Sequence, residues 1–369
     1  MRPWWGEDRE KPQPAEVGDG HDADAHAKTA AAVRAAGIDL DPPLPGRAPD
    51  TRDAARDADA DPTPGADPAG HAHPHLRSAA GQPPVIGIVG GGAVGTALAM
   101  GLTRAGWPVR AVASRDPARR ERFGRLVPGA RAFAEASALV EEVELIILAV
   151  PDDAIAPLAA GLRMYGGQAM VHTSGALGAE VLTPAMAAGT QIGAFHPLVA
   201  FADTERAVAS LHGATIAIEG DEELASLLAD MALALGAQPV RLAPGSKAAY
   251  HAAAVLAAGG FVALLDAIAE LGRVAGLDEP GALAIYGPLV EQTLANARAL
   301  GIRQALTGPI TRGDRGTLDA HLAALRAHAP GVLDLYRAAA SREIELALAR
   351  GALAPEAAEG LRSSLASDP

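Results

Sequence analysis

Residues 85–95 read VIGIVGGGAVG, a stretch in which an apolar run passes directly into closely spaced glycines. The glycines match G-x-G-x-x-G, and the residues after them, 95–105, have helical spacing. In that context the first glycine permits a tight turn, the second lets the backbone approach a pyrophosphate, and the third allows close helix–strand packing. The helix N-terminus then favours the anion. The stretch predicts a dinucleotide-binding turn made by Gly90, Gly92, Ala93, Val94 and Gly95; the alternative is an ordinary glycine-rich turn.

Short aliphatic runs continue along the chain, with Ala/Leu/Arg stretches of helical spacing between several of them. They cover residues 109–113, 143–150, 169–172 and 192–196, and two more, 215–218 and 239–242, bracket a helical stretch at 221–235. Strands that are apolar throughout are buried on both faces, as in a parallel sheet covered by helices. The pattern predicts an α/β Rossmann domain over residues 84–244, doubly wound around a mostly parallel sheet.

The character of the sequence changes after residue 245, where strand signals end. Five helices are expected at residues 246–275, 281–300, 315–327, 331–350 and 355–365. We therefore predict a second, all-α domain over residues 245–369. The longest apolar run, residues 252–265, is shorter than the ~20 residues that span a bilayer, so we interpret it as part of a buried helix and expect no membrane segment.

The first 80 residues differ from the rest in being rich in proline and acidic residues and poor in large apolar ones. Such a segment cannot offset its ordering entropy, so residues 1–80 are expected to form a disordered tail. His71, His73 and His75 cluster within it, but their spacing lacks a rigid frame. We expect no metal site.

Composition excludes several classes of protein. The 369 residues include no cysteine, which rules out disulfides, thiolate metal sites and a cysteine nucleophile. The formal net charge of −13 argues against a surface for nucleic-acid phosphates, and aromatic residues at 3% make a base-stacking platform improbable. A cytoplasmic protein with a small-molecule ligand and no nucleic-acid partner fits this composition.

The second strand ends at Ser114, Arg115 and Asp116. Sites for NAD typically place an Asp or Glu about 20 residues past the glycines, where it holds the ribose 2′-hydroxyl. Here Ser114 stands at that place, and Asp116, beside a proline, is better explained as a helix cap. Arg115 offers a charge-assisted grip on a 2′-phosphate. The sequence therefore predicts NADP(H) rather than NAD(H), held in part by Ser114 and Arg115.

Polar and turn-forming residues follow several of the other strands. In an open parallel sheet, ligands gather at the carboxyl ends of the strands. Val150 and Pro151 end one strand, Ser174 follows the next, and His196 ends a third. We expect Val150, Pro151 and Ser174 to line the cofactor crevice and His196 to bind substrate, although turn chemistry alone also explains these residue types.

Lysine usage gives a clue to catalysis. The chain has three lysines among its 31 Lys and Arg residues, and Lys247 is the one that lies beyond residue 80. Arginine stays protonated at any relevant pH, whereas a partly buried lysine can give and take a proton. Lys247 and His251 share one face of the first turn of a predicted helix. We predict Lys247 as the general acid with His251 beside the same oxygen; chance retention of the lysine and a merely packed histidine are the alternatives.

The segment 305–314, ALTGPITRGD, is predicted to be a rigid loop between helices because it combines glycines with proline. Asp314 can cap the next helix. Arg312 suits a substrate carboxylate, and the competing interpretation pairs it with Asp314 to stabilise the loop.

Several motifs in combination resemble one bacterial family. They are VHTSGAL (171–177), GAFHPL (193–198), Lys247 with Tyr250 and His251, Asn296, and ALTGP (305–309) with Arg312-Gly313-Asp314. That family has a Rossmann-like N-terminal domain and a C-terminal helical domain of unknown function, and the likeness covers about residues 84–350. It is similar in turn to ketopantoate reductases, pyrroline-5-carboxylate reductases and 6-phosphogluconate-type dehydrogenases.

The resemblance implies NADP in the Rossmann cleft, closure by the helical domain, and a homodimer formed through the helices. It also implies substrate-binding roles for Asn296, Thr307 and Arg312. Several members of the wider group use a lysine with an asparagine four residues later, where this sequence has Lys247 and His251.

Together these features favour an NADPH-dependent reductase of a small 2-oxo acid, with ketopantoate as the best single guess. An imine reductase of the pyrroline-carboxylate type is the second hypothesis. The third is a non-catalytic protein that binds NADPH and signals to a partner.

Overall fold

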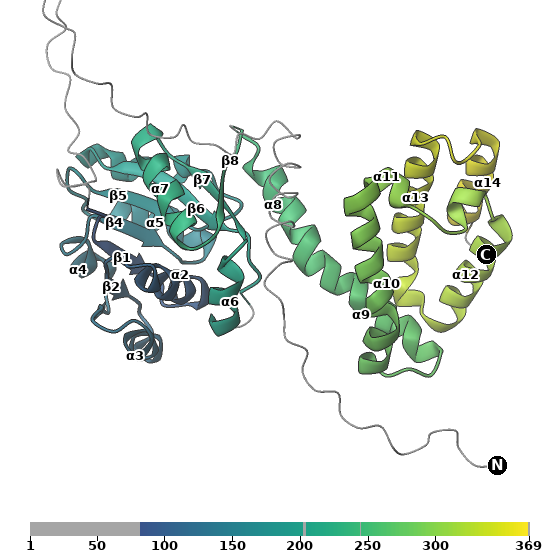
Figure 1. Ribbon diagram of the computed structural model, residues 1–369, viewed down its shortest axis with the longest axis horizontal. Helices are drawn as coiled ribbons and strands as arrows, with labels where there is room; N and C mark the ends of the chain where they lie inside the picture. The colour runs from purple at the N-terminus through teal and green to yellow at the C-terminus, as the bar shows by residue number, and fades with distance from the viewer. Residues whose placement is uncertain (1–81, 202–203, 244, 368–369) are drawn as a thin grey trace, which may run out of the picture. The chain divides into compact units, whose positions relative to one another are not determined.

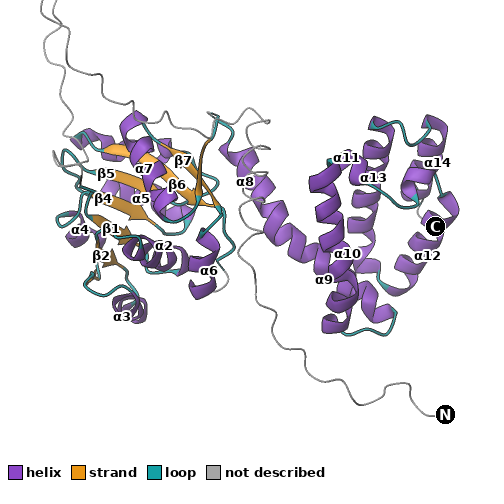
Figure 2. Cartoon of the chain, in the orientation of Figure 1, coloured by secondary structure: helices purple, strands orange, loops and turns teal. Residues whose placement is uncertain are grey.

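The structure of the protein, a computed structural model, describes residues 82–201, 204–243 and 245–367. The tail predicted at residues 1–80, including His71, His73 and His75, lies outside this part. The described chain divides into two compact units, one ending at Ala254 and the other beginning at Val255. The first contains all the strands of the described residues, and the second is helical (Figure 2).

The first unit is built on one eight-stranded sheet (Figure 1). Its strands are β1 (Ile86–Val89), β2 (Val109–Ala113), β3 (Arg131–Phe133), β4 (Leu145–Leu148), β5 (Ala169–His172), β6 (Gln191–Pro197), β7 (Thr215–Glu219) and β8 (Gln238–Arg241). The order β3-β2-β1-β4-β5-β6-β7-β8 begins with the doubly wound Rossmann arrangement. Neighbouring strands are parallel except β6 and β7, which are antiparallel. The predicted Rossmann fold with a mostly parallel sheet is confirmed.

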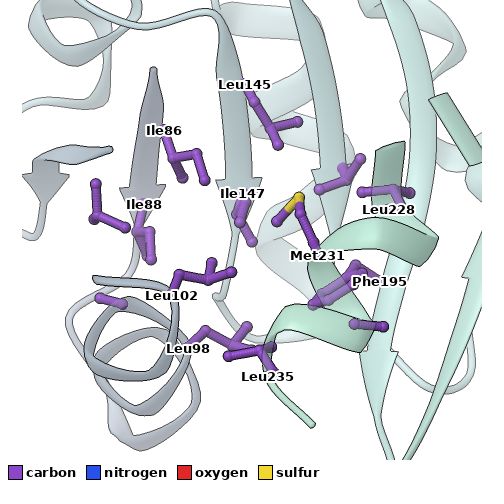
Figure 3. Packing of buried hydrophobic residues seen from close by; sticks show 14 of the residues in the cluster. Ile86, Ile88, Leu98, Leu102, Leu145, Ile147, Phe195, Leu228, Met231 and Leu235 are labelled. Atoms are coloured by element: carbon purple, nitrogen blue, oxygen red, sulfur yellow. The ribbon is translucent and has the colours of Figure 1, made fainter. Parts of the chain in front are cut away.

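Helices cover both faces of the sheet. They are α2 (Ala93–Arg104), α3 (Pro117–Leu126), α4 (Ala136–Val140), α5 (Asp152–Gly161), the 3₁₀ segment η1 (Ala179–Ala188), α6 (Thr204–Leu211) and α7 (Glu222–Ala234). Leu98 and Leu102 of α2 and Met231 of α7 pack with Ile86, Ile147 and Phe195 on one face (Figure 3). Helices α4 and α5 and segment η1 contribute to a second core on the other face, with Ile146 and Met170. The buried, uniformly apolar strands follow directly from this double covering.

The second unit consists of helices. After α8 (Lys247–Val255) come a π-helical turn η2 (Leu256–Gly260), α9 (Phe261–Val274), α10 (Glu279–Leu300), α11 (Ile302–Ala305), η3 (Ile310–Arg312), α12 (Arg315–His328), η4 (Pro330–Val332), α13 (Leu333–Ala349) and α14 (Pro355–Ala366). Leu318, Leu322, Ile344 and Leu361 form part of its core. The all-α character predicted for this region is confirmed.

Three local expectations need correction. The helix expected at residues 246–275 contains the π-helical turn at Leu256–Gly260, where two glycines weaken the regular ladder. Strand β3 was not predicted, because its three residues pair only with β2 at the sheet edge and none is fully buried. The helix expected at 331–350 begins at Leu333, since residues 330–332 form a 3₁₀ turn.

The apolar run at residues 252–265 was expected to be buried, and in this chain it is not. Leu256 is 72% exposed and Val262 64% exposed. Among the described residues, the continuous helix Lys247–Val274 is long and apolar enough to cross a membrane by length and composition alone, and 11% of its most apolar window is buried. The full helix is longer than the uncharged run inside it, and the expectation that it spans no membrane stays a prediction.

Candidate active site

The glycine turn between β1 and α2 has the geometry that its sequence predicts. Gly90 has φ +113°, and a Cβ there would collide with the carbonyl oxygen of Ala149, so only glycine fits. A Cβ on Gly95 would collide with the Gly90 carbonyl oxygen, which explains the close helix–strand packing. At Gly92, by contrast, the nearest atom to a Cβ position is 3.9 Å away, Nη1 of Arg119. The space beside the Gly92 backbone, where a Cβ would lie, is therefore open.

Helix α2 starts without a competing anion. No side chain caps it at Gly92, and its first turn, which begins with Ala93 and Val94, carries no acidic residue. The N–H groups of that turn therefore remain available to an anion, and the open space at Gly92 lies beside them. These residues fit the pyrophosphate of a dinucleotide.

The turn after β2 presents an arginine to solvent. Asp116 accepts hydrogen bonds from the Ala118 and Arg119 N–H groups, so its predicted role as the cap of α3 is confirmed. Arg120 donates to the carbonyl oxygens of Ser114 (2.6 Å) and Arg115 (3.0 Å) and fixes the turn. Within the described residues, the exposed Arg115 guanidinium has no ion-pair or hydrogen-bond partner. Arg115 is thus available to a phosphate, and its role there stays a prediction.

Arg119 is a candidate cofactor residue that the sequence analysis did not assign. Its Nε pairs with Asp116 at 3.3 Å, while its Nη1 lies beside Gly92. Its Cβ is 3.4 Å from the Cβ position of Gly91. The guanidinium therefore lies against the glycine turn. Its position in the first turn of α3, three residues after the cap, was the available signal.

The register of the sheet brings the predicted cofactor-lining residues to one edge. Val89 is level with Leu148, Leu148 with His172, and His172 with Ala194. Val150, Pro151 and Ser174 lie in the segments that follow β4 and β5, and His196 is the last residue but one of β6. Because the four strands are parallel, these segments leave the sheet at the edge occupied by the glycine turn. Val150 is the nearest of them to that turn, with its Cγ1 3.2 Å from the Cβ position of Gly90.

Ser174 also has a local structural task. Its Oγ accepts hydrogen bonds from the Ala176 and Leu177 N–H groups, at 3.2 and 3.0 Å. This is the turn chemistry that the residue type allows. The hydroxyl proton is left for another acceptor, so a contact with a cofactor stays a prediction.

Lys247 is buried at the start of α8. Its side chain is 7% exposed, and its Nζ lies 3.3 Å from Oε1 of Glu219, at the end of β7. Glu219 is thus the ion-pair partner of Nζ, and Nζ is among the buried polar atoms without a hydrogen-bond partner within the described residues. Burial, the largest effect, lowers the Lys247 pKa, and Glu219 opposes the shift.

Three further polar side chains cluster around the end of β6. His196 meets Tyr250 and His251 edge to face, with ring centroids 6.0 and 5.7 Å apart. The Nδ1 atoms of both histidines and the Tyr250 hydroxyl are buried without a hydrogen-bond partner in the described residues. Buried polar groups are normally satisfied, so this cluster indicates a place where a polar ligand supplies the missing partners. Tyr250 was not assigned a role from sequence, although it lies one turn from Lys247.

Gly175 is what allows this cluster to close. A Cβ at this position would collide with Nδ1 of His251 and lie 2.6 Å from Nε2 of His196. The backbone after β5 therefore runs against both rings.

His172 supports the cluster from within the sheet. Its Nδ1 accepts from the Ser174 N–H (3.2 Å), and its Nε2 faces the Gly178 carbonyl oxygen (3.1 Å), which places the proton on Nε2. Burial above all, with Lys247 nearby, lowers the His172 pKa to about 4. Burial also lowers the pKa of His196 to about 4, aided by His251 and Lys247. Both imidazoles are neutral at pH 7.

A cavity of about 460 Å³ lies beside Lys247, within the first unit. Lys247 and Glu219 line it together with Gly178, Glu180 and Arg241. Its lining does not include the glycine turn.

The three substrate-binding residues implied by resemblance lie in the second unit. Asn296 is exposed on α10, and Thr307 and Arg312 are exposed around η3. Asp314 caps α12 by accepting from the Thr317 N–H and hydroxyl, at 3.0 and 2.7 Å, as predicted. Arg312 helps to lower the Asp314 pKa, after those two hydrogen bonds, so the loop-stabilising interpretation of Arg312 has electrostatic support.

Two family descriptions match the sequence. Residues 73–197 match a Rossmann-like domain, and residues 214–343 match a domain of unknown function, DUF2520. The chain joins a Rossmann-like domain to a DUF2520 domain. The DUF2520 match begins at β7, so it includes Glu219, Lys247 and His251 as well as the helices up to α13. The boundary predicted at residue 245 stays a prediction.

Solved structures of similar fold extend over most of this two-domain arrangement. A Bacteroides fragilis protein provisionally described as an NADP oxidoreductase is 25% identical, with a TM-score of 0.59, covering 71% of this chain and 98% of its own. A reductive aminase from Aspergillus terreus, in complex with NADPH and ethyl levulinate, is 19% identical with a TM-score of 0.55, covering 76% and 99%. A pyrroline-5-carboxylate reductase from Streptococcus pyogenes is 18% identical with a TM-score of 0.51, covering 72% and 98%. At these identities the last two show the fold alone. No curated protein matches the sequence significantly.

Proposed function

We propose that this protein is an NADPH-dependent oxidoreductase that reduces the carbonyl group of a small 2-oxo acid, with ketopantoate as the first substrate to test. The observation that carries the proposal is the buried Lys247 ammonium beside the unsatisfied His196, Tyr250 and His251. The turn at Gly90–Gly95 and the free Arg115 support NADPH as cofactor, in agreement with the Bacteroides fragilis protein that is provisionally described as an NADP oxidoreductase.

When bound, NADPH supplies a hydride to the carbonyl carbon, and the reduction needs one proton at the oxygen. Lys247 provides that proton from Nζ, so that the products are the 2-hydroxy acid and NADP⁺. The Tyr250 hydroxyl and His251 hydrogen-bond the same oxygen and stabilise its developing charge. His196 remains neutral at pH 7 and orients the substrate. Arg312 is proposed to bind the substrate carboxylate, and Asn296 and Thr307 are proposed as further substrate-binding residues, as the resemblance of the sequence implies.

The charges around Lys247 favour a carbonyl over an iminium substrate. Glu219, its nearest carboxylate, is already engaged by Lys247 and by the Ala179 N–H. A protonated imine would meet the ammonium without a free counter-charge, whereas a neutral carbonyl oxygen gains from it.

The second candidate is an imine reductase. It is favoured by one observation, that burial lowers the pKa of Lys247, because a neutral amine would not repel an iminium. The non-catalytic NADPH sensor remains the third hypothesis.

A screen of NADPH oxidation separates these functions. Full-length protein is assayed with a panel of 2-oxo acids, ketopantoate included, and with cyclic imines such as pyrroline-carboxylates. Oxidation that depends on a 2-oxo acid supports the proposal, and oxidation that depends only on an imine replaces it with the second candidate. Tight NADPH binding without turnover of either class points to the sensor.

We also propose that the protein is a cytoplasmic homodimer formed through helices α9 and α10. Four of their apolar residues, Val262, Ile285, Leu289 and Leu294, are each more than half exposed, as is Leu256 of the preceding turn η2. A patch of this kind is typical of an interaction surface, and the group that the sequence resembles dimerises through its helices. Light scattering of wild type and Leu289→Glu tests this: a dimer that the substitution dissociates is expected. Binding of the protein to lipid vesicles would instead assign the face to a membrane.

A further inference from the structure

Glu219 lies on β7, the strand that departs from the parallel arrangement of the Rossmann sheet. It ends β7, the strand that runs antiparallel to β6, and is level with Ala194. Ala194 is in turn level with His172 of β5. The change of strand direction thus places a carboxylate in the row of the sheet that contains His172.

The two oxygens of this carboxylate have different partners. Oε2 accepts a hydrogen bond of 2.7 Å from the Ala179 N–H, at the start of η1. Oε1 lies 3.3 Å from Nζ of Lys247. The carboxylate is therefore held by the backbone on one side and faces the ammonium with the other.

We propose that Glu219 is a positioning residue, which holds the Lys247 amine in place for proton donation and keeps it in its charged form. The proposal rests on the proposed function, in which Lys247 donates the proton, and it deepens that function by assigning the group that controls the donor.

The electrostatic surroundings of Lys247 make this control necessary. Burial disfavours its charged form, and Glu219 is the largest opposing influence, ahead of Glu180 of η1 and Asp152 of α5. The other ionisable groups nearby are His172, His196, Tyr250, His251 and Arg241, of which Arg241 lines the same cavity and pairs with Glu222. The two histidines of the sheet are neutral at pH 7, and burial raises the Tyr250 pKa, so none of these three supplies a negative charge. Without Glu219, the pKa of Lys247 falls further.

The cavity beside Lys247 gives a small carboxylate ion room to take the place of the Glu219 side chain in a variant that lacks it. Glu219 and Lys247 both line this space of about 460 Å³, which is far larger than a formate or acetate ion. Removal of the Glu219 side chain therefore leaves a position that a small carboxylate can reach from outside.

The first experiment compares Glu219→Gln with Glu222→Gln. Glu222 is a matched control because it also pairs with a cation, Arg241 at 2.8 Å, but on the surface. In Glu219→Gln the alkaline limb of the kcat–pH profile is expected to shift by about 1–3 pH units toward lower pH, while the Kd for NADPH changes less than about twofold. Glu222→Gln keeps the wild-type limb. An unshifted limb in Glu219→Gln would overturn the proposal.

The second experiment reads the lysine directly and does not depend on turnover. The full chain has three lysines, so selective ¹³C-lysine labelling gives three side-chain signals, and that of Lys247 is assigned by its loss in Lys247→Arg. NMR titration is expected to give Lys247 a pKa at least about one unit lower in Glu219→Gln than in wild type. Equal values in the two proteins would overturn the inference. If this shift occurs in a protein that reduces neither substrate class, the proposed function fails and the control of Lys247 by Glu219 stands.

Rescue distinguishes a charge effect from a packing effect. At alkaline pH, acetate or formate is expected to raise the kcat of Glu219→Ala at least about tenfold. In Glu219→Asp, the alkaline limb of the kcat–pH profile is expected between those of wild type and Glu219→Gln. Chloride at equal ionic strength restores none. Rescue by chloride as well as by acetate would contradict a specific carboxylate role.

Discussion

The rings of His196 and His251 meet edge to face with their centroids 5.7 Å apart, and the backbone of Gly175 leaves no room for a side chain against either. Three elements therefore pack against one another at the candidate site: the end of β6, the first turns of α8 and the segment after β5. None of the three can shift without disturbing the other two.

Gly175→Ala tests this packing. The new methyl group would collide with Nδ1 of His251, so the ring must move away, and kcat is expected to fall by at least about tenfold. Affinity for NADPH should change little, because the glycine turn is separate. Gly161→Ala is the control, since a Cβ there meets nothing within 4 Å. Wild-type turnover in Gly175→Ala would remove His251 from the reaction.

Lys247→Arg tests the proton donor. Arginine keeps the positive charge but does not release a proton at any relevant pH, so turnover is expected to fall at least about tenfold with NADPH binding unchanged. Stopped-flow hydride transfer and fluorescence titration of NADPH measure the two quantities. Lys28→Arg, outside the described residues, is the matched control. Retained turnover in Lys247→Arg would exclude the lysine mechanism.

The glycine turn yields a paired prediction. Gly92→Ala meets no atom closer than 3.9 Å and needs no unusual φ, so its Tm should stay near that of wild type. NADPH affinity should fall at least about tenfold, because the methyl group would occupy the space through which the backbone is predicted to approach the pyrophosphate. Gly90→Ala should instead lose stability, by about 1–3 kcal/mol or more, because φ +113° and the Ala149 carbonyl both exclude a side chain. Calorimetry and cofactor titration check the pair. Wild-type NADPH affinity in a folded Gly92→Ala would place the pyrophosphate elsewhere.

Arg115→Ala addresses cofactor choice. Loss of the guanidinium should weaken NADPH binding by at least about tenfold and leave NADH binding unchanged, because only NADPH carries the 2′-phosphate. Arg110→Ala, an exposed position within β2, serves as a charge-matched control. Tighter binding of NADH than of NADPH by the wild type would show the cofactor prediction to be wrong.

The free energy of unfolding is expected to decrease as the pH is lowered from 7 to 4. The native pKa of His172 is about 4, below the 6.5 of an unfolded histidine, so the unfolded state binds the proton first. The histidine's contribution is complete above pH 6.5 and is lost as the pH falls toward 4; between pH 7 and 5 this amounts to about 2 kcal/mol of the free energy of unfolding. Urea denaturation at the two pH values measures it. In His172→Gln the free energy of unfolding should differ less between pH 7 and pH 5 than in wild type. A difference equal to that of wild type would mean that other groups cause the pH dependence.

The glycine turn, most of the order of strands and helices (the edge strand β3 excepted) and the change from α/β to all-α follow from the sequence by itself. These features are local: the spacing of Gly90, Gly92 and Gly95, the uniformly apolar strands and the end of strand signals near residue 245 each depend on neighbours in the chain. The unusual lysine was equally visible, because composition alone singles out Lys247.

The surroundings of Lys247 were decided only by the tertiary structure. Glu219 comes within 3.3 Å of it because β7 reverses direction against β6, and the contact between Gly175 and His251 depends on the same sheet register. The exposure of Leu256 and Val262 is likewise invisible in a hydropathy pattern, which is the same for a buried helix and for one that faces outward. Spacing along the chain determines which residues share a helix or a strand. Which residues of different helices and strands come into contact depends on strand direction and packing over the whole domain.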